Sequence, residues 1–145
     1  NLAGKFFFKQ PNNLRIELKN LVIISDGVTV WNYNKRQKQV IISNYDENDQ
    51  SMISFRRLIF DYPKKCEVTE KSGNEILLVP KENELNFKSA VLNLNDENLL
   101  RKITITDNNN TIITFEFSNY KLNQIIPKSR FNFLAPEGTK TIDLR

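Results

Sequence analysis

Apolar and polar residues alternate with a period of two along most of this chain, and this period is typical of β-strands. In LRIELKN, Leu14, Ile16 and Leu18 alternate with charged residues, as in an antiparallel strand with one buried face. The preceding stretch, GKFFFKQP, places Phe6 and Phe8 in alternate positions of a first strand. The chain is therefore expected to begin with two strands that share a strongly apolar face.

Turn residues divide the rest of the chain into further strands. Asp26 and Gly27 separate two β-branched runs, and Asp-Gly is the strongest short signal for a hairpin. The clusters KSGN, NDEN and DNNN supply other tight connections. Beyond the hairpin, strands are predicted over residues 38–43, 65–71, 75–80, 88–95, 100–106, 112–120 and 130–134. Together these segments predict one antiparallel meander of about nine strands.

One segment departs from the period of two. Met52, Phe55, Ile59 and Tyr62 recur at spacings of three, four and three residues. This spacing predicts a single amphipathic helix that Pro63 closes.

The predicted sheet has an apolar face that one short helix is too small to cover. The apolar set comprises Phe6, Phe8, Leu14, Ile16, Leu18, Ala90, Leu92, Leu94, Ile103, Ile105, Ile113, Phe115 and Phe117. A sheet with such a face needs cover from helices or from a ligand. The sequence opens at Asn1, directly before a predicted strand. Either further chain upstream of Asn1 supplies that cover, or the apolar face holds something apolar. Phenylalanines at alternate positions are otherwise ordinary core residues.

Composition narrows the possible functions. With 145 residues, 39% hydrophobic and 26% charged, the chain is expected to fold as one globular domain. Its 21 basic residues are interleaved with 17 acidic ones, which indicates a mixed surface and not a nucleic-acid-binding one. The absence of histidine excludes histidine-based catalysis. Cys66 is the single cysteine and Asp46, Glu47 and Asp49 do not have calcium-loop spacing, so no catalytic residue, metal site or cofactor is predicted.

Sequence motifs resemble those of a known family along nearly the whole chain. The ordered stretches are GKFFFKQPNNLRIEL, VIISDGVTVWNYN, KQV, LRKITITDNNNTIITFEFSNYKLNQ and FNFLAPEGTKTID. They are similar to the signature of the LolA outer-membrane lipoprotein carrier proteins, and the similarity runs from Gly4 to Asp143. No apolar run approaches the length of a membrane span, so the protein is not expected to be an integral membrane protein.

The resemblance implies a mainly β fold, an incomplete (open) antiparallel β-barrel with a helical lid. It implies a single domain over residues 1–145 that lacks the family's N-terminal helix and first strands. Such a protein would bind the acyl chains of lipoproteins and perform no catalysis. It would work in the periplasm, between an inner-membrane ABC-type lipoprotein-releasing complex and an outer-membrane receptor.

The resemblance also implies roles for individual residues. Those expected to line the acyl-chain cavity are Phe6, Phe8, Leu14, Ile16, Leu18, Trp31, Leu92, Ile103 and Phe115. Those expected in the lid are Gln10, Met52, Phe55 and Ile59. In the family that the chain resembles, the better-known members carry arginine before the corner proline, where this chain has Gln10. A neutral donor forms weaker hydrogen bonds, so the lid is expected to open more easily.

Some alternatives remain open at this level. Trp31 and Tyr33 share a strand face and could line the cavity, pack as a structural pair under the lid or lie exposed on the convex side. A lipid-sensing regulatory domain of the same fold (RseB-like) and the outer-membrane receptor LolB are alternative functions. A lipid hydrolase is disfavoured, because the chain lacks histidine and a G-x-S-x-G elbow.

Overall fold

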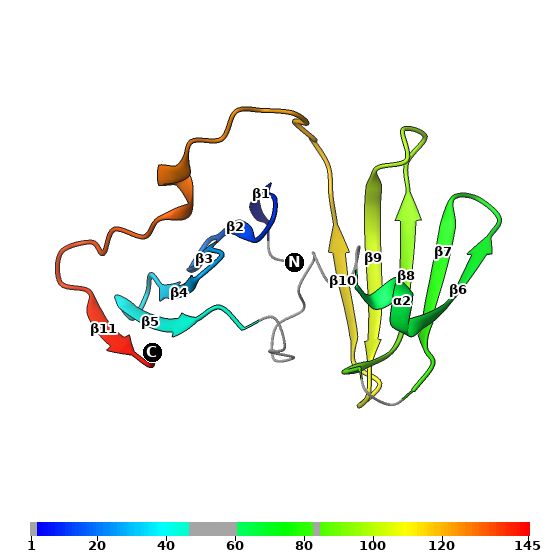
Figure 1. The fold of residues 1–145 in the computed structure, drawn as a ribbon, viewed down its shortest axis with the longest axis horizontal. Coiled ribbons are helices and arrows are strands. Elements are labelled where there is room, and N and C mark those ends of the chain that lie inside the picture. Colours follow the sequence, from blue (N-terminus) through cyan, green and yellow to red (C-terminus); the bar gives the residue numbers. More distant parts are fainter. Residues whose placement is uncertain (1–2, 47–60, 83–84) are drawn as a thin grey trace. The chain divides into compact units, whose positions relative to one another are not determined.

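The computed structural model describes residues 3–46, 61–82 and 85–145. It divides the chain into two compact units, each built on its own sheet (Figure 1). Unit 1 comprises Asn1–Asn48 and Asn123–Arg145, and unit 2 comprises Asp49–Leu122. The predicted helix through Met52, Phe55 and Ile59 lies outside the described residues.

Unit 1 contains a six-stranded sheet with the order β1-β2-β3-β4-β5-β11 (Figure 1). Its strands are β1 (Gly4–Lys9), β2 (Asn13–Leu18), β3 (Leu21–Asp26), β4 (Thr29–Asn34), β5 (Gln39–Asn44) and β11 (Lys140–Asp143). Consecutive strands from β1 to β5 pair antiparallel, whereas β11 pairs parallel to β5. The strands expected at the start of the chain are therefore present with nearly the predicted bounds.

The predicted Asp-Gly hairpin joins β3 to β4. One carboxylate oxygen of Asp26 accepts hydrogen bonds from the backbone N–H groups of Val28 (2.9 Å) and Thr29 (2.8 Å). Gly27 has a φ of 91°, a conformation that residues with a β-carbon rarely adopt. In this turn Asp26 supplies a side-chain acceptor and Gly27 supplies the positive φ, and both features are typical of an Asp-Gly hairpin.

The C-terminal part of unit 1 differs from the prediction. Residues 130–134 do not form a strand: Lys128–Phe131 is a 3-10 helix, η1, and Phe131 within it is only 1% exposed. Burial of this side chain in a turn outweighs the apolar–polar–apolar order of Phe131, Asn132 and Phe133, which would suit a strand. The unpredicted strand β11 is instead aligned on β5, where the Lys140 N–H donates to the Lys38 carbonyl at 2.8 Å.

The core of unit 1 lies on one face of its sheet. Val22 and Ile24 on β3 are buried there with Tyr33 and Val40 from β4 and β5. Trp31, Ile42 and Phe133 pack against this cluster, and the rings of Tyr33 and Phe133 have centroids 5.2 Å apart. The C-terminal segment therefore supplies cover for this face.

Unit 2 contains a five-stranded antiparallel sheet with the order β10-β9-β8-β7-β6, preceded by the short helix α2 (Tyr62–Lys65) (Figure 1). The strands are β6 (Cys66–Lys71), β7 (Glu75–Pro80), β8 (Phe87–Leu94), β9 (Leu100–Asp107) and β10 (Ile112–Glu116). The strand expected to continue to Tyr120 ends at Glu116. The prediction that Pro63 closes a helix is wrong, because Pro63 lies in the first turn of α2, where the missing N–H costs no hydrogen bond.

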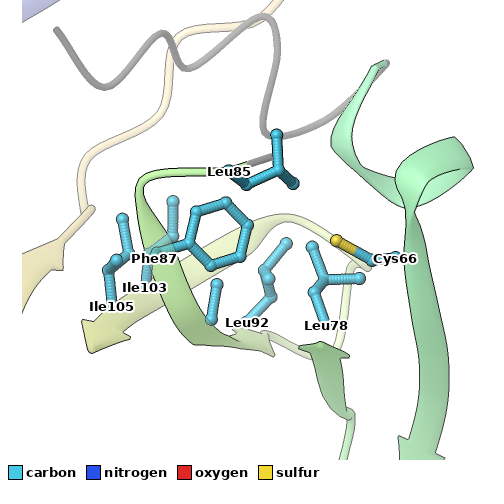
Figure 2. Packing of buried hydrophobic residues seen from close by; sticks show 8 residues of the cluster. Cys66, Leu78, Leu85, Phe87, Leu92, Ile103 and Ile105 are labelled. Carbon is cyan, nitrogen blue, oxygen red and sulfur yellow. The ribbon is translucent and has the colours of Figure 1, made fainter. Parts of the chain in front are cut away.

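The core of unit 2 lies on one face of this sheet (Figure 2). Leu78, Ala90, Leu92, Ile103 and Ile105 come from adjacent strands and are buried together. The buried side chains of Cys66, Leu85 and Phe87 complete the cluster, and Tyr62 packs on Phe87 with ring centroids 5.3 Å apart.

The structure confirms a mainly β protein with open sheets, but the single meander is wrong. The described strands form two sheets, and neither closes into a barrel. Because β11 occupies the second edge of β5, β6 has no edge on which to continue the first sheet. The expected apolar set is accordingly divided between the units, five residues in unit 1 and eight in unit 2.

Candidate functional site

The candidate site is the face of the unit 1 sheet that lies opposite its core. In the ladder between β1 and β2, Phe6 pairs with Ile16, Phe8 with Leu14 and Gly4 with Leu18. Side chains of directly paired residues point to the same face of a sheet. The structure thus brings together five of the residues expected to contact acyl chains, Phe6, Phe8, Leu14, Ile16 and Leu18. We call them the apolar wall.

The apolar wall is not part of the buried cluster of unit 1. Ile16 pairs with Ile23, whereas the core residues Val22 and Ile24 occupy the alternate positions of β3. Phe6 is 40% exposed, and the other four wall residues are half-buried. Phe6 and Phe8 stack with ring centroids 6.5 Å apart and an interplanar angle of 13°. The sheet of unit 1 is therefore apolar on both faces, and only one face carries the core.

Gly4 allows Leu18, at one end of the apolar wall, to pack closely against β1. A β-carbon at this position would lie 2.2 Å from the Glu17 carbonyl oxygen and 2.6 Å from Leu18 Cδ2. Both distances are far shorter than van der Waals contact, so Leu18 packs across β1 only because residue 4 has no side chain. The glycine of the opening motif thus has a packing role in the wall.

Trp31 lies on the face opposite the apolar wall. It pairs with Ile24, and together with Tyr33 it belongs to the core side of the sheet. Tyr33 is buried in the core cluster beside Phe133, and Trp31 packs against the same cluster. Trp31 and the five wall residues therefore do not share a surface.

Three further residues expected in the cavity lie in unit 2. Leu92 pairs with Ile103, which pairs with Phe115, so the three are neighbours on one face. Leu92 and Ile103 are buried at 9% and 0% exposure, and Phe115 packs against their cluster (Figure 2 shows Leu92 and Ile103). Their environment is that of core residues in unit 2.

Of the four residues expected in the lid, Gln10 lies within the described residues. Gln10 is exposed in the turn between β1 and β2, where it precedes Pro11 in a cis peptide bond. Met52, Phe55 and Ile59 lie outside the described residues. A helical lid is therefore not part of the described structure.

Sequence reasoning missed the contacts that cover the core side of β1 and β2. The guanidinium carbon of Arg130 lies 4.9 Å from the ring centroid of Phe7, a cation–π contact. Arg15 donates to the Arg130 carbonyl at 3.1 Å and to the Glu17 carboxylate at 2.6 Å. The only sequence signal was the alternation itself, which puts Phe7 on the face opposite Phe6 and Phe8. Arg130 and its backbone carbonyl thus lie against the side of β1 and β2 that is opposite the apolar wall.

Three chemical features of the described residues bear on other functions: metal-binding groups, the single cysteine and membrane-spanning helices. Among residues 3–46, 61–82 and 85–145, no group of three or more histidine, cysteine or acidic side chains could hold a metal ion. Cys66 is buried in the core of unit 2, and this burial raises the pKa of its thiol, although the charge of Lys81 acts in the opposite direction. In the same described ranges, no helix has the length and apolar character that crossing a membrane requires.

Comparisons with known proteins agree with the expected family. The sequence profile described as "Outer membrane lipoprotein carrier protein LolA" matches residues 1–134. The outer-membrane lipoprotein carrier protein of Francisella tularensis subsp. novicida is 27% identical over 150 aligned positions, which cover 99% of this chain and 72% of that protein. The protein of the same name from Pectobacterium atrosepticum is 26% identical over 98% of this chain and 71% of its own length.

A solved structure shares the fold. The crystal structure of an uncharacterized conserved protein from Thermus thermophilus superimposes with a TM-score of 0.55 at 12% identity, over 98% of this chain and 82% of that one. At this identity the similarity concerns the fold alone. The sequence-profile match shows more than a shared fold, because it covers most of the chain and identifies a sequence family. That family consists of carriers, not of enzymes. This chain belongs to the LolA family of outer-membrane lipoprotein carrier proteins.

Proposed function

We propose that this protein binds the acyl chains of lipoproteins against the apolar wall and carries them through the periplasm. In this proposal it receives them from an inner-membrane ABC-type releasing complex and delivers them to an outer-membrane receptor. The observation that carries the proposal is the second apolar face of the unit 1 sheet, where Phe6 and Ile16 lie outside the core. Membership of a lipoprotein carrier family supports the same function.

The energetics suit a carrier. Burial of a lipid methylene group is worth about 0.8 kcal/mol, so an acyl chain of roughly 14 methylenes gains on the order of 10 kcal/mol when it is fully enclosed. Non-directional apolar contacts hold such a chain without fixing one pose, which favours release to a receptor. The wall is consistent with this requirement, because all five of its side chains are hydrocarbon.

We further propose that the wall is one side of an open barrel with a helical lid. Residues 52–62 have the helical spacing expected of that lid, and Met52, Phe55 and Ile59 would cover the bound chains. Gln10, in the exposed turn after β1, would hold the lid with neutral hydrogen bonds only.

Native mass spectrometry of the protein tests the proposal directly. We expect a complex with a triacylated lipopeptide and none with its deacylated form. Phe6→Ser should weaken the complex, whereas Val28→Ser, at a hairpin residue that is 71% exposed, should not. Failure of the acylated lipopeptide to bind, with an apolar dye also excluded, would show that the wall is covered by the protein's own chain.

A further inference from the structure

Positive charge is concentrated in one of the two units. Unit 1 contains eleven Lys and Arg side chains and six Asp and Glu side chains, whereas unit 2 contains ten and eleven. The formal charge of +4 is therefore the sum of +5 in unit 1 and −1 in unit 2. An asymmetry of this kind is informative about partners even where the total charge is small.

Part of this charge surrounds an irregular segment of the chain. No acidic residue occurs between Glu116 and Glu137, a stretch that contains Lys128 and Arg130 of unit 1. After β10 the chain follows no helix or strand until η1 begins at Lys128 (Figure 1). Ile125, in the middle of this segment, is 99% exposed.

A basic residue from the start of the chain lies beside the same segment. The ammonium group of Lys9 on β1 donates to the Ile126 carbonyl at 3.4 Å. Arg130 lies over the ring of Phe7, which is also on β1. Within the part of the chain that the structure describes, no acidic side chain forms an ion pair with Lys9, Lys128 or Arg130. We call Lys9, Ile125, Lys128 and Arg130 the basic–apolar patch.

We propose that the basic–apolar patch docks the protein on an anionic phospholipid surface. Single exposed aliphatic residues are common, and basic residues alone favour any acidic partner. A fully exposed isoleucine among cations without acidic partners matches a membrane interface instead, where the aliphatic side chain enters the headgroup boundary and the cations meet lipid phosphates. Each such cation strengthens binding about fivefold at an anionic surface.

This docking is separate from the proposed acyl-chain site. Lys9 and Phe7 occupy the positions of β1 that alternate with Phe6 and Phe8, so the patch adjoins the core side of the sheet. A protein bound through the patch keeps its apolar wall away from the lipid. Loss of docking and loss of acyl-chain binding should therefore occur in different variants.

Vesicle co-sedimentation tests this inference with two compositions, phosphatidylcholine alone and phosphatidylcholine mixed equally with phosphatidylglycerol. We expect binding to the mixed vesicles only, and it should weaken with added salt. The double variant Lys9→Glu/Lys128→Glu should lose at least about 25-fold in binding, and Ile125→Ser should lose several-fold. Lys64→Glu/Arg101→Glu, at exposed positions of unit 2, changes the net charge equally and should retain binding.

The other outcomes would overturn the proposal. Equal binding to both vesicle types would assign the attraction to apolar contact and not to the charged patch. An equal loss in the unit 2 control would assign it to net charge. Salt-sensitive binding to a polyglutamate peptide but not to vesicles would identify the patch as a site for an acidic protein. Lipopeptide binding by Ile125→Ser should match that of the wild type in every case.

Discussion

A carboxylate placed in the apolar wall should make acyl-chain binding dependent on pH. Ile16 is the natural position, because it pairs with Phe6 on one side and Ile23 on the other and so lies in the middle of the wall. It is half-buried and outside the core cluster, so Ile16→Glu should fold. In the free protein the new side chain reaches water, whereas bound acyl chains would exclude that water.

The magnitude follows from the cost of neutralising the carboxylate. An apolar environment disfavours the charged form and raises the pKa of the carboxyl in the complex. With an ordinary glutamate pKa of about 4.3, protonation at about pH 7 costs roughly 4 kcal/mol, so affinity should fall by up to about 500-fold. Because the complex binds the proton more tightly, affinity should recover about tenfold per pH unit as the pH falls, and approach the wild-type value near about pH 4.

Titration of a fluorescent acyl probe at several pH values measures this effect. Ile16→Gln has nearly the same shape without the titrating group and should show weaker binding that does not change with pH. Lys9→Glu, on the opposite face of β1, should bind the probe like the wild type. A pH-independent loss in Ile16→Glu, or the same pH dependence in Lys9→Glu, would refute the assignment of the wall as the acyl-chain site.

Three further predictions concern stability and titration. Phe131→Ala removes a side chain that is 1% exposed and should cost about 3–5 kcal/mol in the free energy of unfolding. Denaturant titration followed by the fluorescence of Trp31, the single tryptophan, measures this, and a loss below about 1 kcal/mol would contradict the burial. Gly4→Ala should displace β1 from β2, because its β-carbon would meet the Glu17 carbonyl at 2.2 Å. Hydrogen exchange of the β1 amides should then accelerate, and unchanged protection would argue against this packing. Hydrogen bonds from the Arg145 side chain and backbone lower the pKa of Asp143 to about 2, so Arg145→Gln should return it toward 3.8 in an NMR titration. Since the folded-state pKa is the lower one, the associated stabilisation is present above about pH 4 and is lost as the pH falls through about 2. An Asp143 pKa that is the same in both proteins would contradict the pairing.

Local structure and the grouping of side chains within strands follow from the order of residues alone. A period of two requires that Leu14, Ile16 and Leu18 share a face, whatever that face contacts. The Asp-Gly pair requires a tight turn, because its side-chain acceptor and its positive φ act within four residues. These interactions join residues that are close in sequence, so the pattern of residue types is sufficient to predict them.

Strand pairing beyond sequence neighbours, and the choice of the face that carries the core, depend on contacts between distant segments. Alternation places Trp31 and Tyr33 together, but the choice of their face depends on Phe133, a residue about a hundred positions away. The parallel pairing of β11 with β5 ends the first sheet and divides the expected apolar set between two units. Such choices depend on the summed packing and hydrogen bonding of distant segments, for which no short motif exists. The same physics explains why the shared face of the β1 and β2 wall residues could be predicted from sequence, whereas the contact of Arg130 with Phe7 on the opposite face could not.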